Sequence, residues 1–139
     1  MKKISALVVT YNRLTLLKEC LAALTDSDYT LTNIIIVNNA STDETASFLE
    51  QLVAENPDLY KVVNSKRNLG GAGGFNLGFK YFINQTNTDY LWVMDDDTIV
   101  QKETLTYLMR PFDEFKNVGY TASNVLWTDH TPVLMNVGV

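Results

Sequence analysis

The chain has 139 residues, a formal net charge of −5, 46% hydrophobic residues and a single cysteine. This length suits one domain with a hydrophobic core, and we expect residues 1–139 to form a single domain. The acidic balance without a basic run argues against a nucleic-acid-binding protein, because such proteins neutralise phosphates with lysine and arginine.

The cysteine and the N-terminus indicate where the protein works. Cys20 lies on the apolar side of a helical pattern, so we expect a small buried side chain and a reducing cytoplasm. The apolar stretch over residues 4–9 is too short for a signal sequence or a membrane span. We therefore expect a soluble cytoplasmic protein, which leaves peripheral association with the inner face of a membrane open.

Strand-like and helix-like patterns alternate from the N-terminus. Residues 4–10 form a short apolar run that predicts a buried strand, and apolar residues at helical spacing over residues 17–24 predict a helix. The β-branched residues 34–37 predict a second strand. Ser41 and Glu44, three positions apart, are typical of a capping box and predict the start of a second helix.

The second half of the chain repeats this alternation. Residues 60–63 predict a third strand, and a glycine-rich turn separates it from a helix over residues 75–83. Residues 90–94 predict a fourth strand. Apolar spacing over residues 105–112 predicts a helix that ends or kinks near Pro111.

The order of these elements predicts the fold class. Residues 118–122 are a candidate fifth strand. Strands that alternate with helices predict an α/β fold with an open, mostly parallel, Rossmann-like sheet and flanking helices, because parallel neighbours need crossover connections. Ligands of such sheets bind beyond the carboxyl ends of the strands. The turns after the four strands contain TYNR, NNASTD, SKRNLGGAGG and DDD, and all four are expected at that edge.

Three consecutive aspartates follow the fourth strand. Like charges at the end of a buried strand repel one another unless a cation or hydrogen-bond donors compensate. In an extended chain Asp95 and Asp97 point the same way and Asp96 the other way, so Asp95 and Asp97 are candidate ligands of Mg²⁺ or Mn²⁺. A solvated helix N-terminus explains acidic residues equally well, so both interpretations stay open on these residues alone.

The stretch NLGGAGGFNLG contains five glycines: Gly70, Gly71, Gly73, Gly74 and Gly78. This density is entropically unfavourable unless a close approach or a positive φ is needed, and the stretch could hold a phosphate at a helix N-terminus. Its spacing matches neither the dinucleotide fingerprint nor the Walker A pattern. Packing of a helix against the sheet explains one or two of these glycines but not five.

Polar side chains in the same turns suit two roles: Thr10, Asn12, Asn38, Asn39, Arg67 and Asn68. A planar guanidinium and an amide recognise nucleotide bases well. Asparagine is also common in turns because its side chain caps backbone groups. The residues alone leave both roles open.

The ordered motifs VVTYNR, IIIVNNASTDET, RNLGGAGGFNLG and YLWVMDDD resemble the nucleotide-sugar-binding half of family 2 glycosyltransferases, which have the GT-A fold. The glycine run and MDDD are most similar to galactofuranosyltransferase and rhamnosyltransferase-like members. The resemblance extends over residues 4–125. It implies that the donor is bound by Thr10, Asn12, Arg13, Asn38, Asn39, Arg67, Asn68, Gly71, Asp95 and Asp96.

The resemblance also implies a metal and a base preference. Asp95 and Asp97 would hold Mn²⁺ or Mg²⁺ against the diphosphate. Asn39, or else Asn38, stands where the family commonly has an aspartate that reads the base, and an amide suits uracil or thymine. His130, the only histidine, follows the aspartates at too short an interval for the family's downstream ligand.

The implied function is metal-dependent transfer of a sugar from a UDP- or dTDP-sugar to a glycan or lipid-linked acceptor, in cell-surface polysaccharide synthesis. In this family the catalytic base and the acceptor site lie further downstream, so we expect the base beyond Val139 and this chain to be the donor-binding part. A nucleotide-sugar-binding module without turnover is the alternative. A phosphatase or nucleotidyltransferase would need its motif after the first strand, where the chain has TYN. The sequence indicates no oligomeric state.

Overall fold

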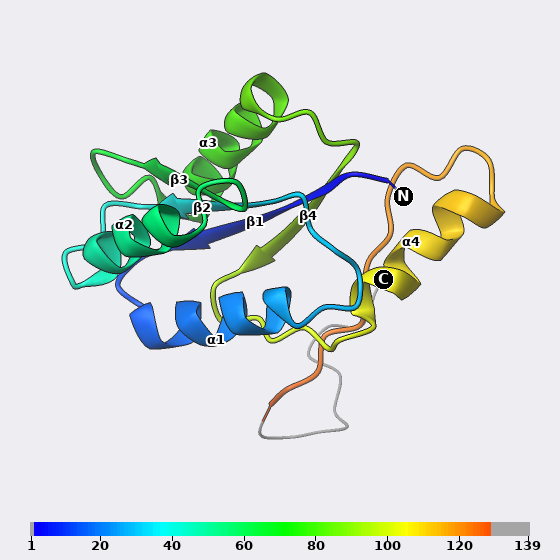
Figure 1. The fold of residues 1–139 in the computed structure, drawn as a ribbon, viewed down its shortest axis with the longest axis horizontal. Coiled ribbons are helices and arrows are strands. Elements are labelled where there is room, and N and C mark those ends of the chain that lie inside the picture. The colour runs from blue at the N-terminus through cyan, green and yellow to red at the C-terminus, as the bar shows by residue number, and fades with distance from the viewer. Residues whose placement is uncertain (1, 129–139) are drawn as a thin grey trace.

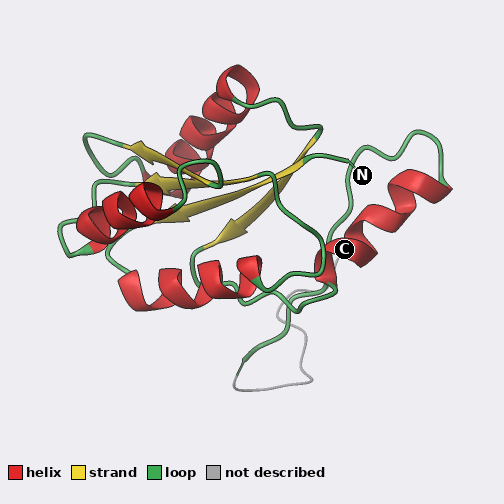
Figure 2. Cartoon of the chain, viewed as in Figure 1, coloured by secondary structure: helices red, strands yellow, loops and turns green. Residues whose placement is uncertain are grey.

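The computed structural model describes residues 2–128 and shows helices on both sides of a sheet (Figure 1). The elements in chain order are β1 (Ile4–Thr10), α1 (Leu14–Thr25), β2 (Asn33–Asn38), α2 (Thr45–Glu55), β3 (Tyr60–Asn64), α3 (Gly70–Gln85), β4 (Tyr90–Asp95) and α4 (Thr104–Glu114). The four strands pair in parallel in the order β3-β2-β1-β4 (Figure 2). The predicted α/β class with an open parallel sheet is confirmed.

The strand order places a topological switch point beside β1. The chain steps from β1 to β2 to β3 in one direction and then returns through α3 to β4, on the other side of β1. In the register of the sheet, Thr10 lies opposite Asn38 on β2, and Val9 lies opposite Asp95 on β4. The carboxyl ends of β1 and β4 therefore flank the position where ligands bind in open α/β sheets.

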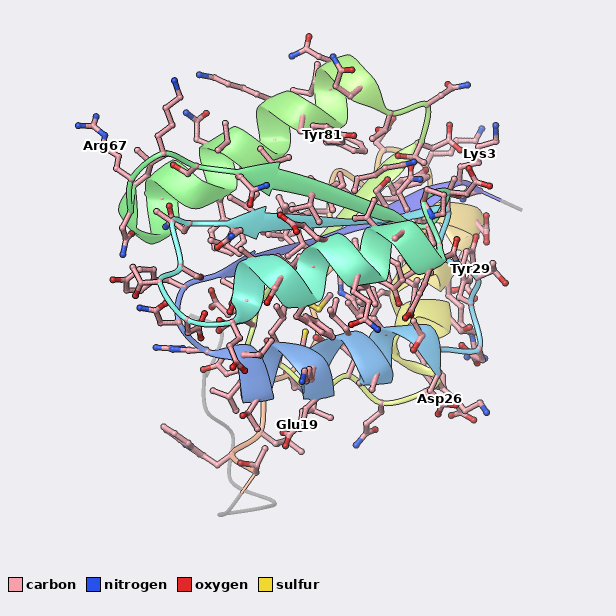
Figure 3. All side chains as sticks on the ribbon, turned by 60° about the vertical axis from the view of Figure 1, so that its left-hand side comes forward. Lys3, Glu19, Asp26, Tyr29, Arg67 and Tyr81 are labelled. Carbon is pink, nitrogen blue, oxygen red and sulfur yellow. The ribbon has the colours of Figure 1, made fainter. Side chains whose placement is uncertain are left out.

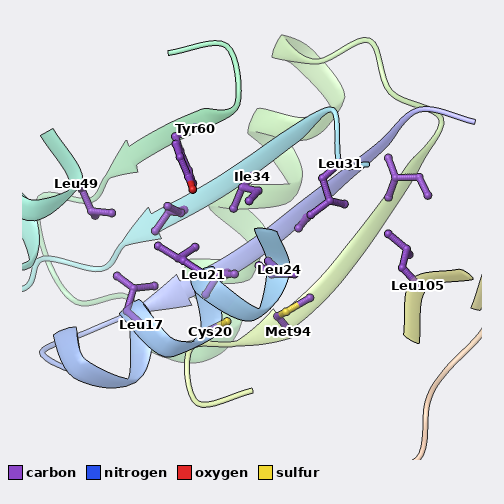
Figure 4. Packing of buried hydrophobic residues seen from close by; sticks show 14 of the residues in the cluster. Leu17, Cys20, Leu21, Leu24, Leu31, Ile34, Leu49, Tyr60, Met94 and Leu105 are labelled. Atoms are coloured by element: carbon purple, nitrogen blue, oxygen red, sulfur yellow. The ribbon is translucent and has the colours of Figure 1, made fainter. Parts of the chain in front are cut away.

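Two hydrophobic clusters cover the two faces of the sheet. The larger cluster joins alternate residues of β1, such as Val8, to α1, α2 and α4 through Leu17, Leu49 and Leu105 (Figure 4). The smaller cluster lies under α3 and contains the intervening residues of β1 and β2 with partly buried side chains of α3. Every residue of β1 is buried, as expected for a central strand covered on both faces. No helix within residues 2–128 is long and apolar enough to cross a membrane.

Two sequence expectations about the elements are wrong: the Ser41 cap and the fifth strand. Ser41 does not cap α2, which begins at Thr45. The backbone N–H of Thr45 instead donates to Asp43 Oδ1 at 3.0 Å. Helix α4 ends at Glu114, shortly after Pro111, and one lost amide donor in the last turn does not interrupt it. Residues 118–122 form no strand; they run past α4, where the Thr121 hydroxyl donates to a backbone carbonyl of that helix.

The glycine run forms the first turns of α3 itself and not a turn before it. Gly70 has φ +70°, which glycine adopts without strain. Gly74 and Gly78 are buried against β1: a Cβ on Gly74 would lie 2.6 Å from Val9 Cγ1, and a Cβ on Gly78 would overlap the side chain of Leu7. These glycines let α3 approach the sheet closely.

Alanine at position 78 should destabilise the fold relative to alanine at position 71. Both changes add helix propensity, but only Gly78→Ala places a methyl group against the buried Leu7, whereas nothing lies within 4 Å of a Cβ on Gly71. Overpacking of this kind costs about 1–3 kcal/mol. Urea unfolding of the two variants should give a free-energy gap of that size, and equal stabilities would contradict the close packing of α3.

Candidate functional site

The ends of β1 and β4 meet through a buried hydrogen bond. Thr10 Oγ1 donates to Asp96 Oδ2 at 2.8 Å, and the two residues are 1% and 4% exposed. Thr10 is the last residue of β1, and Asp96 follows the last residue of β4. The hydrogen bond thus fixes one carboxylate at the topological switch point of the sheet.

The three aspartates have different surroundings. Strand β4 ends at Asp95, whose carbonyl accepts the amide of Thr98, so the strand alternation assumed for the three residues ends there. Arg13 Nη1 lies 3.4 Å from Asp96 Oδ1 and 3.6 Å from Asp97 Oδ2. Asp95 is exposed, and its carboxylate has no hydrogen bond or ion pair with the residues described. Two of the three carboxylates therefore share one cation.

Burial changes the acid–base properties of this edge. Burial raises the pKa of the Asp96 carboxyl and the charge of Asp97 adds to this, although the Thr10 hydroxyl and the Arg13 guanidinium oppose it. Cys20 is buried as expected, and its Sγ donates to the Asp95 carbonyl at 3.8 Å. Burial raises the pKa of this thiol to about 12, so Cys20 is no nucleophile at neutral pH.

Asn12 joins the turn after β1 to the turn after β2. It adopts φ 52°, its backbone N–H donates to Ser41 Oγ at 3.1 Å, and its side-chain Oδ1 accepts the backbone N–H of Thr42 at 2.7 Å. Asparagine tolerates this left-handed backbone better than most residues. In this structure the Asn12 side chain is therefore a connector between two loops.

Asn38 connects the ends of β2 and β3. Its Nδ2 donates to Asn64 Oδ1 at 3.0 Å, and its Oδ1 accepts the Ser41 amide at 3.0 Å. The residue is 4% exposed. Both ends of its side-chain amide are thus engaged within the protein.

Asn39 ties the turn after β2 to the start of α3. Its Nδ2 donates to Asn68 Oδ1 at 3.0 Å and to the Gly70 carbonyl at 3.1 Å, and its Oδ1 accepts the Leu69 amide at 2.9 Å. Asn68 Oδ1 also accepts the Gly70 amide at 2.8 Å. These contacts hold the first turn of α3 in place.

Two further candidates lie at the open side of this edge. The Arg67 side chain extends away from the sheet (Figure 3) and forms no ion pair within residues 2–128. Gly71 is exposed on α3, with open space where a Cβ would stand. No close contact within the described chain and no positive φ requires glycine at position 71.

The structure brings most of the predicted residues to one edge and adds three that sequence reasoning missed. Asn64 lies one residue beyond the third strand as predicted, and its side chain pairs with Asn38. Ser41 was expected at a helix cap but binds Asn12, and so does its neighbour Thr42. The polar composition of NNASTD was the available signal for both. His130 lies outside the described residues.

Replacement of Asp96 by asparagine should stabilise the protein near neutral pH. The pKa of Asp96 in the folded protein is raised above its ordinary value of 3.8. Ionisation of this carboxyl therefore lowers the free energy of unfolding as the pH rises from 3.8 through the folded-state pKa. Asparagine keeps the shape without the charge. Urea unfolding should show a gain for Asp96→Asn at neutral pH that shrinks as the pH falls toward about 4.

The matched control is Asp97→Asn, whose side chain is 53% exposed and whose stability should change little. A loss of stability in Asp96→Asn at neutral pH would contradict this account, because it would mean that the charged carboxylate is net stabilising.

Known proteins are similar to this chain in sequence. The sequence matches the model of Glycosyl transferase family 2 over residues 5–133. It is 35% identical over 94 residues to galactofuranosyltransferase GlfT1 of Mycolicibacterium smegmatis, covering 68% of this chain and 30% of the relative. It is 28% identical over 121 residues to poly-beta-1,6-N-acetyl-D-glucosamine synthase of Staphylococcus aureus, covering 87% of this chain and 28% of the relative. The chain thus spans about three-tenths of the length of the curated relatives it matches.

Solved structures share the fold. S. aureus TarS 1-349 in complex with UDP-GlcNAc matches with a TM-score of 0.67 and 30% identity, over 81% of this chain and 31% of TarS. Mannosyltransferase PcManGT from Pyrobaculum calidifontis, in complex with GDP-Man and Mn²⁺, matches with a TM-score of 0.64 and 25% identity, over 75% of this chain and 30% of PcManGT. With the family match over residues 5–133, the chain belongs to glycosyl transferase family 2.

Proposed function

We propose that this chain is the donor-binding part of a metal-dependent glycosyltransferase. It takes a UDP- or dTDP-sugar as donor and serves transfer to a glycan or lipid-linked acceptor in cell-surface polysaccharide synthesis. The observation that carries this proposal is the cluster at the carboxyl ends of β1 and β4, where Asp96 and Asp97 converge on one positive charge. The relatives support sugar transfer in polysaccharide synthesis, since their names include a galactofuranosyltransferase and a poly-beta-1,6-N-acetyl-D-glucosamine synthase.

The carboxylates fit a divalent cation of the kind the proposal needs. Within the part of the chain that the structure describes, no three acidic, histidine or cysteine side chains are close enough to hold an ion by themselves. Mg²⁺ and Mn²⁺ commonly take one or two protein carboxylates and complete their shell with water and substrate phosphate. The carboxylate oxygens of Asp96 and Asp97 both face the Arg13 guanidinium, so they already converge on one positive charge. The exposed Asp95 is next to them in the chain. PcManGT, which shares the fold, was solved with Mn²⁺.

Each of these residues has a distinct role in the proposed reaction. Asp97, with Asp95, would hold the metal, which when bound offsets the negative charge that develops on the leaving diphosphate. The Thr10 hydroxyl holds the Asp96 carboxylate in a fixed orientation at the same edge. Arg13 supplies positive charge next to the carboxylates, and Gly71 leaves room for the donor at the first turn of α3.

The asparagines contribute to the donor pocket mainly through its shape. The side-chain amides of Asn38 and Asn39 are engaged with neighbouring loops, so direct reading of a base by either would need its hydrogen bonds to be exchanged. They hold the turns after β2, β3 and at the start of α3 in one arrangement. Uracil or thymine remains the proposed base, and the neighbour that contains GDP-Man makes GDP the necessary comparison.

The proposal also concerns where the protein works in the cell and whether it turns over its donor. We place the protein in the cytoplasm, where nucleotide sugars are available, with contact to the inner face of the membrane if the acceptor is lipid-linked. The competing function is a nucleotide-sugar-binding module without turnover. Binding without transfer or hydrolysis of the donor would favour that module.

Nucleotide binding should depend on both the metal and Asp97. In a thermal-shift screen with UDP, dTDP and GDP, we expect UDP or dTDP to raise the melting temperature only when Mn²⁺ is present. Asp97→Ala should abolish this increase, because it removes a carboxylate proposed to hold the metal. Asp58→Ala, an exposed aspartate just before β3 and so at the opposite edge of the sheet, is the control and should respond as the wild type does.

A flat response of the wild type to all three nucleotides, with and without Mn²⁺, would contradict the proposed function. A full response in Asp97→Ala would leave nucleotide binding intact but remove Asp97 from the metal site.

Alanine at position 71 should weaken nucleotide binding without destabilising the fold. The Cβ of Gly71→Ala enters open space in the protein but would crowd a donor bound at the first turn of α3. Titration calorimetry with UDP and Mn²⁺ should show affinity lower by about tenfold, the size expected for an extra methyl group in a packed contact. Gly119→Ala, which also enters open space, should bind as the wild type does. Unchanged affinity in Gly71→Ala would place the donor away from α3.

A further inference from the structure

Arg13 occupies an unfavourable position in the chain. It is the N-cap residue of α1, and its carbonyl accepts the Leu17 amide at 2.9 Å. The N-terminus of a helix carries a partial positive charge and favours acidic residues, so an arginine there is unfavourable by itself. Its guanidinium instead lies over Asp96 and Asp97. The attraction of those carboxylates compensates for the poor match with the helix.

The way Arg13 contacts the aspartates is that of a simple cation. A single nitrogen, Nη1, makes both contacts, at 3.4 Å to Asp96 and 3.6 Å to Asp97. Arginine usually binds a carboxylate through two parallel hydrogen bonds at shorter distances. Arg13 therefore provides one positive charge between two carboxylates and does not use its fork geometry.

Arg13 is also the sole cationic partner of this cluster in the described chain. No other lysine or arginine within residues 2–128 forms an ion pair with Asp95, Asp96 or Asp97. Three adjacent carboxylates repel one another, and one of them is buried. Arg13 offsets part of that repulsion in the free protein.

We propose that Arg13 is an internal counter-ion that occupies Asp96 and Asp97 until a divalent cation displaces it, after which its guanidinium pairs with the phosphates of the donor. This inference rests on the proposed function and deepens it. Asp97 is both a partner of Arg13 and a proposed metal ligand, so the guanidinium and the metal compete for the same carboxylate.

The pair has the properties that an exchangeable contact needs. The side chains of Arg13 and Asp97 are 55% and 53% exposed, and ion pairs of that exposure are weak. A divalent cation is attracted to the same carboxylates more strongly than a single guanidinium charge is. The buried hydrogen bond from Thr10 keeps Asp96 in place when Arg13 leaves, so the carboxylate remains oriented.

Displacement of Arg13 links metal binding to diphosphate binding. A metal on the aspartates releases a guanidinium for the phosphates, and phosphates that attract the guanidinium release the aspartates for the metal. Each ligand then favours the other, and by linkage the two effects are equal in free energy. Arg13 is thus a positioning residue and not one that reacts.

The test is the affinity of Mn²⁺ alone, measured by the loss of its free-ion electron paramagnetic resonance signal. We expect Arg13→Ala to bind Mn²⁺ about three- to tenfold more tightly than the wild type, because a competing surface ion pair is gone. Arg13→Lys, which retains the charge without the fork, should bind as the wild type does. Arg110→Ala removes an equal charge from a side chain that stacks on Tyr107 of α4, and it should leave the affinity unchanged.

A second measurement separates competition from general effects of charge. With Mn²⁺ saturating, Arg13→Ala should bind UDP more weakly than the wild type, whereas Arg13→Lys should restore part of that affinity. Circular dichroism spectra and melting curves of the variants establish that each is folded. If Arg13→Ala is unfolded, the UDP affinity of Arg13→Lys is compared with that of the wild type instead.

The outcomes distinguish this inference from the proposed function. Equal or weaker Mn²⁺ affinity in Arg13→Ala, in a wild-type protein that binds UDP with Mn²⁺, would overturn the role of Arg13 and leave the proposed function standing. Failure of the wild type to bind either Mn²⁺ or UDP would overturn both.

Discussion

The structure depends on the complete burial of β1. This strand pairs with β2 and β4 at its edges, and helices cover both of its faces. Its two polar side chains therefore find partners near its ends: Ser5 pairs with Thr88 near the amino end, and Thr10 lies at the carboxyl end. Thr10, the last residue of β1, donates a hydrogen bond from its hydroxyl to the Asp96 carboxylate. The same central position of β1 makes its end the topological switch point. One packing constraint thus decides both the fold and the place of the site.

Much of the fold was predictable because the signal was strong. The four strands are short β-branched or apolar runs. The two central strands, β1 and β2, are buried between helices, as such continuous runs indicate, whereas the edge strands β3 and β4 are mostly half-buried. The strand order was not predictable from these runs, since nothing in the residues 60–63 or 90–94 specifies which neighbour they pair with. In the structure α3 packs on the face of β1 opposite α1, and Gly74 and Gly78 allow that close approach.

The candidate site was predictable in location but not in its contacts. The sequence indicated that polar turns meet at one edge, and the structure places Thr10, Arg13 and the aspartates there. Strand alternation suggested that Asp95 and Asp97 act together, but β4 ends at Asp95, and a turn brings Asp96 and Asp97 to Arg13 instead. Such contacts depend on where a strand stops, and strand ends are the weakest signal in a sequence.

The asparagines show a second limit of the sequence. An amide looks the same in a sequence whether it reads a base or joins two loops, and here Asn12, Asn38 and Asn39 join loops. The resulting edge is held by hydrogen bonds of the asparagines on the side of β2 and β3, and by the longer contacts of Arg13 on the side of β4. This division suits a pocket that is preformed for a nucleotide and adjustable for a metal.

The most direct test of this account is the position of a bound metal and nucleotide. In crystals grown with UDP and Mn²⁺, the anomalous signal of manganese should lie beside Asp97, with the diphosphate between the carboxyl end of β1 and the start of α3. A manganese peak away from the aspartates, or a nucleotide bound in the cavity between β4 and α4, would contradict it.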